Sequence, residues 1–327
     1  MIAVIGGAGY IGSHAVKYLI EQGEKVVVFD NLCTGHLELV HKDAQFLEGD
    51  LASLQDLHTL FTQYPNITSV IHFAAFAYVG ESVQNPAKYY HNNLANTLNL
   101  LGVMLKNNVK NIVFSSTCAT YGNPIELPIT EQHPQNPINP YGRTKFMMEQ
   151  LMEDYSTAYG LKYVALRYFN AAGADEDGAI GEWHEPESHL IPLILDVALG
   201  KSDSINVFGS DFDTPDGTCV RDYIHVTDLA DAHYKALQFL RKEQQSLQLN
   251  LANGEGYSNL EIIKMVEQVT NRTIQYQLTE RRPGDPSQLI GCADKAKLII
   301  NWVPKYKLEQ IVETAWHWHQ KKFGGKI

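Results

Sequence analysis

Residues 2–12 read IAVIGGAGYIG, and this stretch decides the fold. Four apolar residues predict a short buried strand, which a turn of the form G-x-x-G-x-x-G at Gly6, Gly9 and Gly12 follows directly. A helix is predicted next, over residues 14–22. Glycine permits the tight turn and lets backbone N–H groups approach a pyrophosphate at the helix N-terminus. Strand, turn and helix together therefore predict a unit that binds a dinucleotide.

Apolar runs and helices alternate along the rest of the first half, which is typical of βαβ units and a parallel sheet. Further strands are predicted at 25–30, 44–49, 70–75, 111–117 and 162–169, and further helices at 50–64, 92–106 and 141–159. The strands are apolar on both faces, as buried parallel strands are. The fold class predicted is α/β, with a doubly wound parallel (Rossmann) sheet.

Beyond residue 170 the pattern loosens, and segments 171–189 and 201–223 are predicted to be irregular. Weaker helices are predicted at 227–243, 258–270 and 307–322. We expect a nucleotide-binding domain at 1–170 and a smaller mixed α/β domain for the substrate at 171–327, with some later segments returning to the first domain.

Composition excludes several classes of protein. The 327 residues carry 26 Lys+Arg against 37 Asp+Glu, and this net charge of −11 argues against nucleic acid as the main partner. No apolar run approaches the roughly 18 residues of a membrane span, and no secretory signal is visible. The four cysteines are far apart, so we expect no disulfides and a cytoplasmic location.

Two aspartates end consecutive predicted strands. Asp30 lies 18 residues after Gly12, close to the spacing of a carboxylate that binds the ribose of a dinucleotide. No Lys or Arg follows within residues 31–34, so NAD is favoured over NADP. Asp50 ends the next strand, and it either contacts the adenine amino group, which we favour, or caps the following helix.

Tyr141 and Lys145 lie four residues apart on a predicted helix, and hence on one face of it. The spacing alone is weak, but the strand before this helix ends in Ser115-Ser116-Thr117. The carboxyl ends of parallel strands border the ligand crevice. A nearby ammonium and a bound nicotinamide cation would both favour the phenolate of Tyr141. Tyr141 could then take a proton from a sugar hydroxyl that Thr117 or Ser115 holds in line.

Longer motifs carry a family resemblance. The stretches GGAGYIGSH (6–14), SSTCATYG (115–122) and YGRTK (141–145) resemble the extended short-chain dehydrogenase/reductase superfamily. RYFNAAGA (167–174), VRDYIHV (220–226) and RRPGD (281–285) are more specific, and with them the chain is similar to the UDP-glucose 4-epimerases from Ile2 to about His319.

The resemblance implies a tightly held NAD that oxidises C4 of a UDP-hexose, a 4-ketopyranose that turns within the site, and return of hydride to its other face. It implies Tyr141 as base and then acid, Lys145 as its tuner and ribose anchor, and Thr117 as the hydroxyl partner. The implied NAD-binding residues are Gly6, Gly9, Tyr10, Ile11, Gly12, Asp30, Asn31, Asp50, Leu51, Phe73, Ala74, Asn92, Ser115, Tyr141, Lys145 and Tyr168. The implied substrate-binding residues are Thr117, Phe169, Asn170, His189, Leu190, Phe208, Arg221, Arg282 and Asp285.

Some positions depart from the family pattern. Ala77 and His189 stand where some members have Lys and Asn. Leu289 stands at the position that gates N-acetylated sugars, and it leaves their use open.

Two rival functions remain. A dehydratase of this fold carries an Asp-Glu pair after the Thr, where this chain has Cys118-Ala119. A non-catalytic NAD-binding regulator has no need of the Tyr141–Lys145 pair.

Two further expectations concern metals and assembly. His184, Glu185, Glu187 and His189 show no recognised metal spacing, so no metal is expected. Apolar residues on the helices at 92–106 and 141–159 form wide surfaces, among them Leu94, Leu98, Leu101 and Leu105 on the first and Met147, Met148, Leu151, Met152, Tyr155 and Tyr159 on the second. Such surfaces serve either the core or a partner, and the resemblance implies a homodimer through these two helices.

Overall fold

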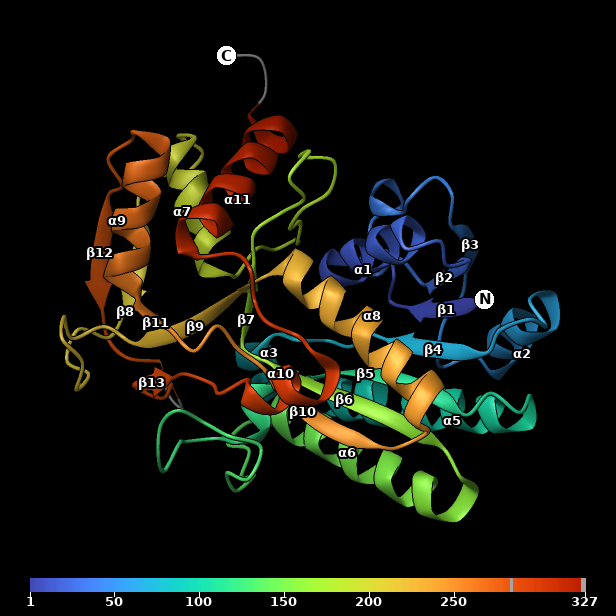
Figure 1. Ribbon diagram of the computed structural model, residues 1–327. Helices are drawn as coiled ribbons and strands as arrows, with labels where there is room; N and C mark the ends of the chain where they lie inside the picture. The colour runs from blue at the N-terminus through green and yellow to red at the C-terminus, as the bar shows by residue number, and fades with distance from the viewer. Residues whose placement is uncertain (283–284, 325–327) are drawn as a thin grey trace.

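A computed structural model describes residues 1–282 and 285–324, and its centre is a seven-stranded parallel sheet (Figure 1). The strand order is β10-β6-β5-β4-β1-β2-β3, with the reversal between β1 and β4 that a doubly wound fold has. This confirms the fold class predicted from the sequence. The strands are β1 (Ile2–Ile5), β2 (Val26–Asp30), β3 (Gln45–Glu48), β4 (Ser69–His72), β5 (Asn111–Thr117), β6 (Lys162–Tyr168) and β10 (Leu247–Leu251).

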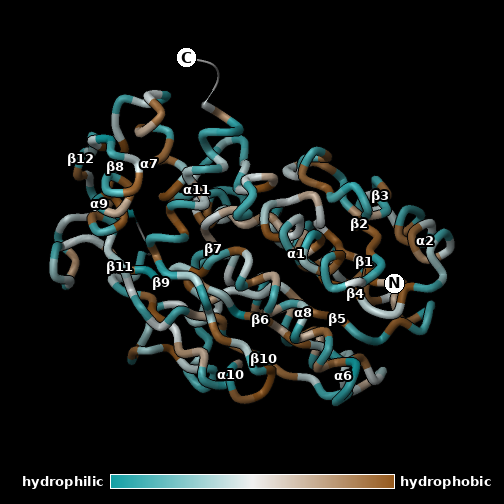
Figure 2. The backbone as a smooth tube through the Cα atoms, turned by 45° about the horizontal axis from the view of Figure 1, so that its top comes forward, coloured by the Kyte–Doolittle hydropathy of each residue, from teal (hydrophilic) through white to brown (hydrophobic). Residues whose placement is uncertain are grey.

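Helices cover both faces of this sheet. Helices α1 (Tyr10–Glu21) and α8 (Val226–Glu243) pack on one face, and α2 (Leu54–Gln63), α5 (Asn96–Lys106) and α6 (Pro140–Tyr159) pack on the other. The strands between them are largely hydrophobic, while many outer loops are hydrophilic (Figure 2). Each fully buried Val, Leu or Ile side chain contributes about 1.5–3 kcal/mol, so these two layers account for most of the stability of the sheet.

Local sequence sets both ends of helix α6. The side chain of Asn139 accepts a hydrogen bond from the backbone N–H of Gly142 at 2.8 Å, and Pro140 occupies the first helical position. Gly160 ends the helix in the left-handed conformation, with φ at 73°. The helix predicted for 141–159 therefore forms, one residue longer at its start.

The helix predicted for 92–106 is wrong at its beginning. Residues Tyr90–Ala95 form a π-helical turn, and the α-helix starts only at Asn96. Buried Asn93 explains the wider turn, because its side chain accepts from the N–H of Phe76 at 2.9 Å and donates to the C=O of Phe76 at 3.0 Å. A tertiary contact of this kind leaves no local signal in the sequence.

A smaller lobe lies beside the carboxyl ends of the large sheet (Figure 1). The prediction that segment 201–223 is irregular is wrong in part, because the segment contains one strand and the start of another. The helix at 190–198 was not predicted. The lobe's elements are β7 (Asn170–Ala172), α7 (Leu190–Ala198), β8 (Ile205–Phe208), β9 (Val220–His225), β11 (Gly256–Ser258), α9 (Asn259–Thr270), β12 (Tyr276–Thr279), β13 (Gln288–Leu289) and α11 (Leu308–Phe323). Shorter elements elsewhere are η1 (Leu37–Leu39), α3 (Val79–Gln84), α4 (Pro86–Tyr89), η3 (Cys118–Thr120) and α10 (Asp294–Ile300). Within the residues described, no helix is long and apolar enough to cross a membrane.

A buried ion pair ties helix α6 to the sheet. Arg167 on β6 donates from Nη2 to Glu149 Oε2 on α6 at 2.6 Å, and from Nε to both carboxylate oxygens at 3.0 and 3.1 Å. Ser116 on β5 donates to the same carboxylate, and Tyr121 accepts from Arg167 Nη1 at 3.0 Å. Glu149 raises the pKa of Arg167 further above its already high value, against the effect of burial. Removing one member would leave a buried charge without its partner.

We therefore expect Arg167→Met to lower the free energy of unfolding by about 3–5 kcal/mol, as measured by urea denaturation. The matched control is Arg143→Met, which replaces an exposed arginine on the same helix and should change stability by no more than about 0.5 kcal/mol. Equal effects of the two substitutions would show that the pair does not hold the helix.

Candidate active site

One cavity of about 840 Å³ opens at the carboxyl ends of the central strands and extends under the smaller lobe. Its lining includes every cofactor, catalytic and substrate position predicted from the sequence. Ile5 and Gly6 reach it from the end of β1, Asp30 from β2, and Thr117 from β5. The structure thus brings together residues that lie up to 279 positions apart, from Gly6 to Asp285.

The glycine loop forms a backbone cradle at one end of this cavity. Gly6 has φ of 81°, and a Cβ on Gly12 would lie 2.1 Å from the carbonyl oxygen of Gly6. Helix α1 begins at Tyr10 without a side-chain cap or an acidic residue in its first turn, so its first N–H groups are available to an anion. The cradle therefore fits the pyrophosphate of a dinucleotide.

Two carboxylates, those of Asp30 and Asp50, also line this cavity. Asp30 accepts hydrogen bonds from the backbone N–H groups of Ala8 and Leu32, each at 2.9 Å. Burial raises the pKa of Asp30, while these two N–H groups act in the opposite direction. The Asn31 amide donates to Asp50 at 2.8 Å, so the two residues lie side by side.

The alternative role of Asp50 as a helix cap is wrong. Ser53 caps helix α2 instead, and its hydroxyl accepts from the N–H of Asp56. Asp50 lies too early in the chain for that role, because the helix begins at Leu54 and not at residue 50. One carboxylate oxygen of Asp50 accepts from the N–H of Ala52 at 2.7 Å.

Tyr141 and Lys145 enter the cavity from the first turns of helix α6. Lys145 donates from Nζ to the backbone C=O of Ser115 at 2.8 Å and lies 4.9 Å from the centre of the Phe114 ring. Burial lowers the pKa of Lys145 to about 7 and raises the pKa of Tyr141 above its ordinary value. The phenol therefore keeps its proton until positive charge arrives next to it.

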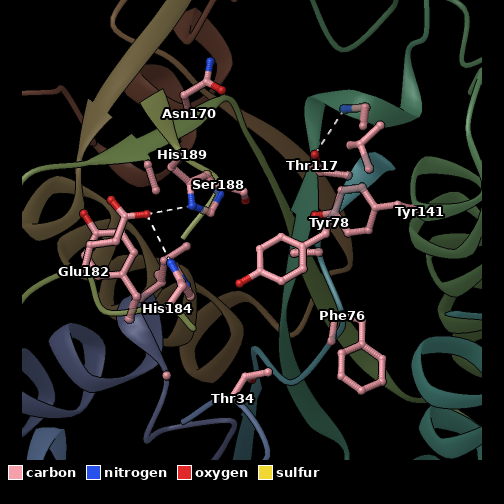
Figure 3. Close-up of a pocket in the computed structure, with 18 of the residues that line it drawn as sticks. Thr34, Phe76, Tyr78, Thr117, Tyr141, Asn170, Glu182, His184, Ser188 and His189 are labelled. Carbon is pink, nitrogen blue, oxygen red and sulfur yellow. Dashed lines mark hydrogen bonds and ion pairs between the residues drawn. The ribbon is translucent and has the colours of Figure 1, made fainter. Parts of the chain in front are cut away.

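Hydroxyl groups at the end of β5 lie beside this pair. Ser115 hydrogen-bonds to the phenol of Tyr168, and Thr117 accepts from the N–H of Ala119 at 3.1 Å. Figure 3 shows Thr117 and Tyr141 on one side of the cavity. Burial raises the pKa of the Cys118 thiol to about 12, so Cys118 is not a thiolate nucleophile at neutral pH.

Two arginines reach the cavity from the smaller lobe. Arg221 on β9 pairs with Asp285 at 3.0 Å, and the Arg282 guanidinium lies 3.8 Å from the centre of the Phe208 ring. A planar guanidinium suits phosphate oxygens and aromatic faces. Asn170 donates to the C=O of Asp222 at 3.0 Å, and Leu289 also lines the cavity. Pro283 and Gly284 of the RRPGD motif lie outside the described residues.

Opposite Tyr141, the loop before α7 places two histidines between two carboxylates (Figure 3). His184 and His189 each direct Nδ1 toward Glu182 and Glu187. These carboxylates raise the pKa of His184 to about 9 and that of His189 to about 10, against the effect of burial. Glu185 does not join this group, and it accepts from Trp183 Nε1 at 2.9 Å.

Sequence reasoning missed Glu182 as a member of this group. The signal was present in the spacing E-x-H-x-x-E-x-H from Glu182 to His189. That spacing does not match the period of a helix or a strand. The sequence therefore showed the four residues close together in the chain, but it did not show that their side chains converge.

Fold and site together define an enzyme of the dinucleotide-dependent α/β class, with a second ligand region under a smaller lobe. The model of the "NAD dependent epimerase/dehydratase family" matches residues 2–252, and the chain belongs to this family.

Several known proteins are similar over nearly the whole chain. The UDP-glucose 4-epimerase of Halalkalibacterium halodurans is 54% identical over 321 residues, which cover 98% of this chain and 96% of the relative. A crystal structure of a UDP-glucose 4-epimerase is 49% identical, covers 100% of this chain and 99% of that one, and has a TM-score of 0.96. The UDP-glucose 4-epimerase of Bifidobacterium longum, solved with NAD⁺ and UDP, is 39% identical with a TM-score of 0.95, and 99% of each chain is covered.

The position of Asp30 generates a prediction about cofactor choice. Asp30→Asn removes a negative charge that would repel a 2′-phosphate and keeps one oxygen, which can accept from one of the two N–H groups of Ala8 and Leu32. We expect the ratio of the NADP to the NAD dissociation constant to fall by about tenfold, as measured by titrating the cofactor-free chain. Asp43→Asn, at an exposed aspartate, should leave the ratio unchanged. An unchanged ratio in Asp30→Asn would remove Asp30 from cofactor selection.

Proposed function

We propose that this chain is an isomerase that interconverts UDP-galactose and UDP-glucose at C4 of the hexose. The observation that carries the proposal is the continuous cavity that places the glycine loop at one end, the two arginines at the other, and Tyr141 between them. The similar proteins named UDP-glucose 4-epimerase support it along nearly the full length of the chain.

The NAD-binding positions of this chain hold a cofactor that supplies a reversible acceptor for hydride from C4. Gly6, Gly9 and Gly12 cradle its pyrophosphate, and Asp30 accepts from its ribose hydroxyls. Lys145, which donates to the C=O of Ser115, would also hold the ribose of the cofactor and add positive charge near Tyr141.

Tyr141 Oη takes the proton of the C4 hydroxyl as the carbon is oxidised and returns it when the carbon is reduced on the other face. Thr117 holds that hydroxyl in line with Tyr141. Burial raises the pKa of Tyr141 and a hydrogen bond with Thr117 lowers it, and a cationic nicotinamide ring would lower it further when bound.

Arg221 and Arg282 bind the pyrophosphate of the UDP-sugar, with Phe208 and Asn170 beside them. Asp285 keeps Arg221 in place until the phosphate arrives. The sugar lies next to Phe169 and can turn between the oxidation of C4 and its reduction, because only its phosphates are held by charge. Elimination of water is disfavoured, because Cys118 and Ala119 stand where a dehydratase needs its acid.

The purified chain should convert UDP-galactose to UDP-glucose without added NAD, as measured by chromatography of the nucleotide sugars. Tyr141→Phe should retain NAD and lose at least about 100-fold in turnover, because the proton acceptor is gone. The matched control is Tyr159→Phe, which alters an exposed tyrosine at the far end of the same helix and should keep full activity.

Absence of conversion by a folded chain that contains NAD would overturn the proposed reaction. Full activity in Tyr141→Phe would instead remove only Tyr141 from the mechanism. A 4-keto-6-deoxy sugar as product would identify the chain as a dehydratase.

The protein is also proposed to be a homodimer through helices α5 and α6. Their outer faces leave Leu98 41% and Met147 39% exposed, with Tyr159 exposed at the helix end. The apolar stripe on α5 divides between core and surface, because Leu101 is buried in the sheet layer while Leu98 is not. A cytoplasmic location is proposed as well, because the four cysteines are all free thiols.

Light scattering should therefore give twice the 36.7 kDa mass of one chain. Met147→Asp should shift the protein toward monomer, because a carboxylate would be buried unpaired at the interface. Leu298→Asp, at a leucine 85% exposed on helix α10, should leave the dimer intact. A monomeric wild type would contradict this assembly.

A further inference from the structure

The cluster of Glu182, His184, Glu187 and His189 has the arrangement of a metal centre. Their four ligand atoms all lie within 4.8 Å of one another. His184 Nδ1 lies 3.4 Å from Glu182 Oε1 and 3.4 Å from Glu187 Oε2. His189 Nδ1 lies 2.9 Å from Glu182 Oε1 and 3.0 Å from Glu187 Oε1. A tetrahedral Zn²⁺ with bonds of about 2.0–2.1 Å separates its ligand atoms by about 3.3 Å, and the two His184 separations are close to this value while the two His189 separations are shorter.

Hydrogen bonds satisfy this arrangement only in part, because His189 Nδ1 bonds to Glu187 Oε1 at 3.0 Å while His184 Nδ1 has no such bond. Each imidazole Nδ1 carries at most one hydrogen, yet each faces a carboxylate oxygen on two sides. His184 Nδ1 is buried and has no hydrogen-bond partner of acceptable geometry. Over residues 1–282 and 285–324, Glu182 and Glu187 form no ion pair with a Lys or Arg. A divalent cation would meet all four ligand atoms and neutralise both carboxylates.

The surroundings hold these ligands in place, as the groups around a metal site do. Glu187 Oε1 accepts from the backbone N–H groups of Ser188 and His189 at 2.7 and 2.8 Å. The backbone C=O of Glu182 accepts from Trp318 Nε1 on helix α11 at 3.0 Å. These bonds orient the carboxylate of Glu187 and fix the main chain at Glu182.

We propose that Glu182, His184, Glu187 and His189 form a closed structural site for Zn²⁺ or a similar divalent transition metal. Two imidazoles select such a metal over Mg²⁺ and Ca²⁺, which prefer all-oxygen ligands. Four protein ligands leave no open position, so the ion serves structure and not the chemistry at C4. This interpretation replaces the sequence-based expectation of no metal, which had considered Glu185 in place of Glu182.

The ion would tie the loop that follows β7 to the start of α7. His189 precedes the first residue of that helix, and the ring of His184 lies edge-on to Tyr10 of the glycine loop, with ring centres 6.2 Å apart. Tyr10 also donates to the C=O of Gly173 at 2.6 Å, at the beginning of the same loop. The metal would thus form part of the cavity wall between the cofactor end and the substrate end. It would bind His189 Nδ1, so that this nitrogen would not contact a substrate phosphate.

The test is metal binding by the full chain with its cofactor, and it does not depend on epimerase activity. After dialysis against a chelator, the protein is titrated with ZnCl₂ or MgCl₂, and bound metal is measured by elemental analysis. We expect one Zn²⁺ per chain, no stoichiometric Mg²⁺, and a rise of about 3 °C or more in the unfolding temperature with Zn²⁺.

Glu187→Gln should weaken Zn²⁺ binding at least about 100-fold and abolish the thermal shift. Glu185→Gln is the matched control, because it removes the same charge from the same loop outside the cluster, and it should bind as the wild type does. If Glu187→Gln does not fold, His184→Gln tests the same ligand set.

Failure of the wild type to bind one Zn²⁺ would overturn the site and leave a network of protonated histidines between carboxylates. Equal affinities of Glu187→Gln and Glu185→Gln would do the same, because the bound metal would then lie elsewhere.

Discussion

The site depends first on how closely helix α6 approaches the ends of strands β5 and β6. Glu149, Arg167 and Ser116 join one residue from each of these three elements inside the core. Two turns and one turn before Glu149, respectively, the same helix carries Tyr141 and Lys145 into the cavity. A shift of this helix would move the phenol away from Thr117 and the ammonium away from Ser115. A network buried for structural reasons thus sets the geometry on which the proposed proton transfer relies.

Charge is concentrated locally within an acidic chain. The net charge of −11 describes the surface and predicts nothing about a ligand that carries two phosphates. Uncapped N–H groups of α1 lie at one end of the cavity, and Arg221 and Arg282 lie at the other. Burial lowers the pKa of Lys145 and raises that of Tyr141, so the protein disfavours both charges until ligands bind. We therefore expect proton transfer by Tyr141 only when ligands occupy the site.

Features with a local cause were predictable. Strand β5 and the ends of helix α6 follow from an apolar run, from Asn139-Pro140 and from Gly160. Features that depend on distant partners were not. Strand β8 forms by pairing with β12, helix α7 is apolar nearly all round and lacks a capping side chain, and the π-helical turn exists because Asn93 binds Phe76. Glu182 was missed for the same reason, since an irregular loop alone brings it to the two histidines.

In the proposed reaction, hydrogen leaves C4 of the sugar and returns to the same carbon without exchange with water. Conversion of UDP-galactose in D₂O, followed by NMR of the product, tests it most directly. The account predicts UDP-glucose with no deuterium at C4, because the hydride stays within the closed site. Deuterium at C4 would contradict the account, because the hydrogen would then have come from solvent.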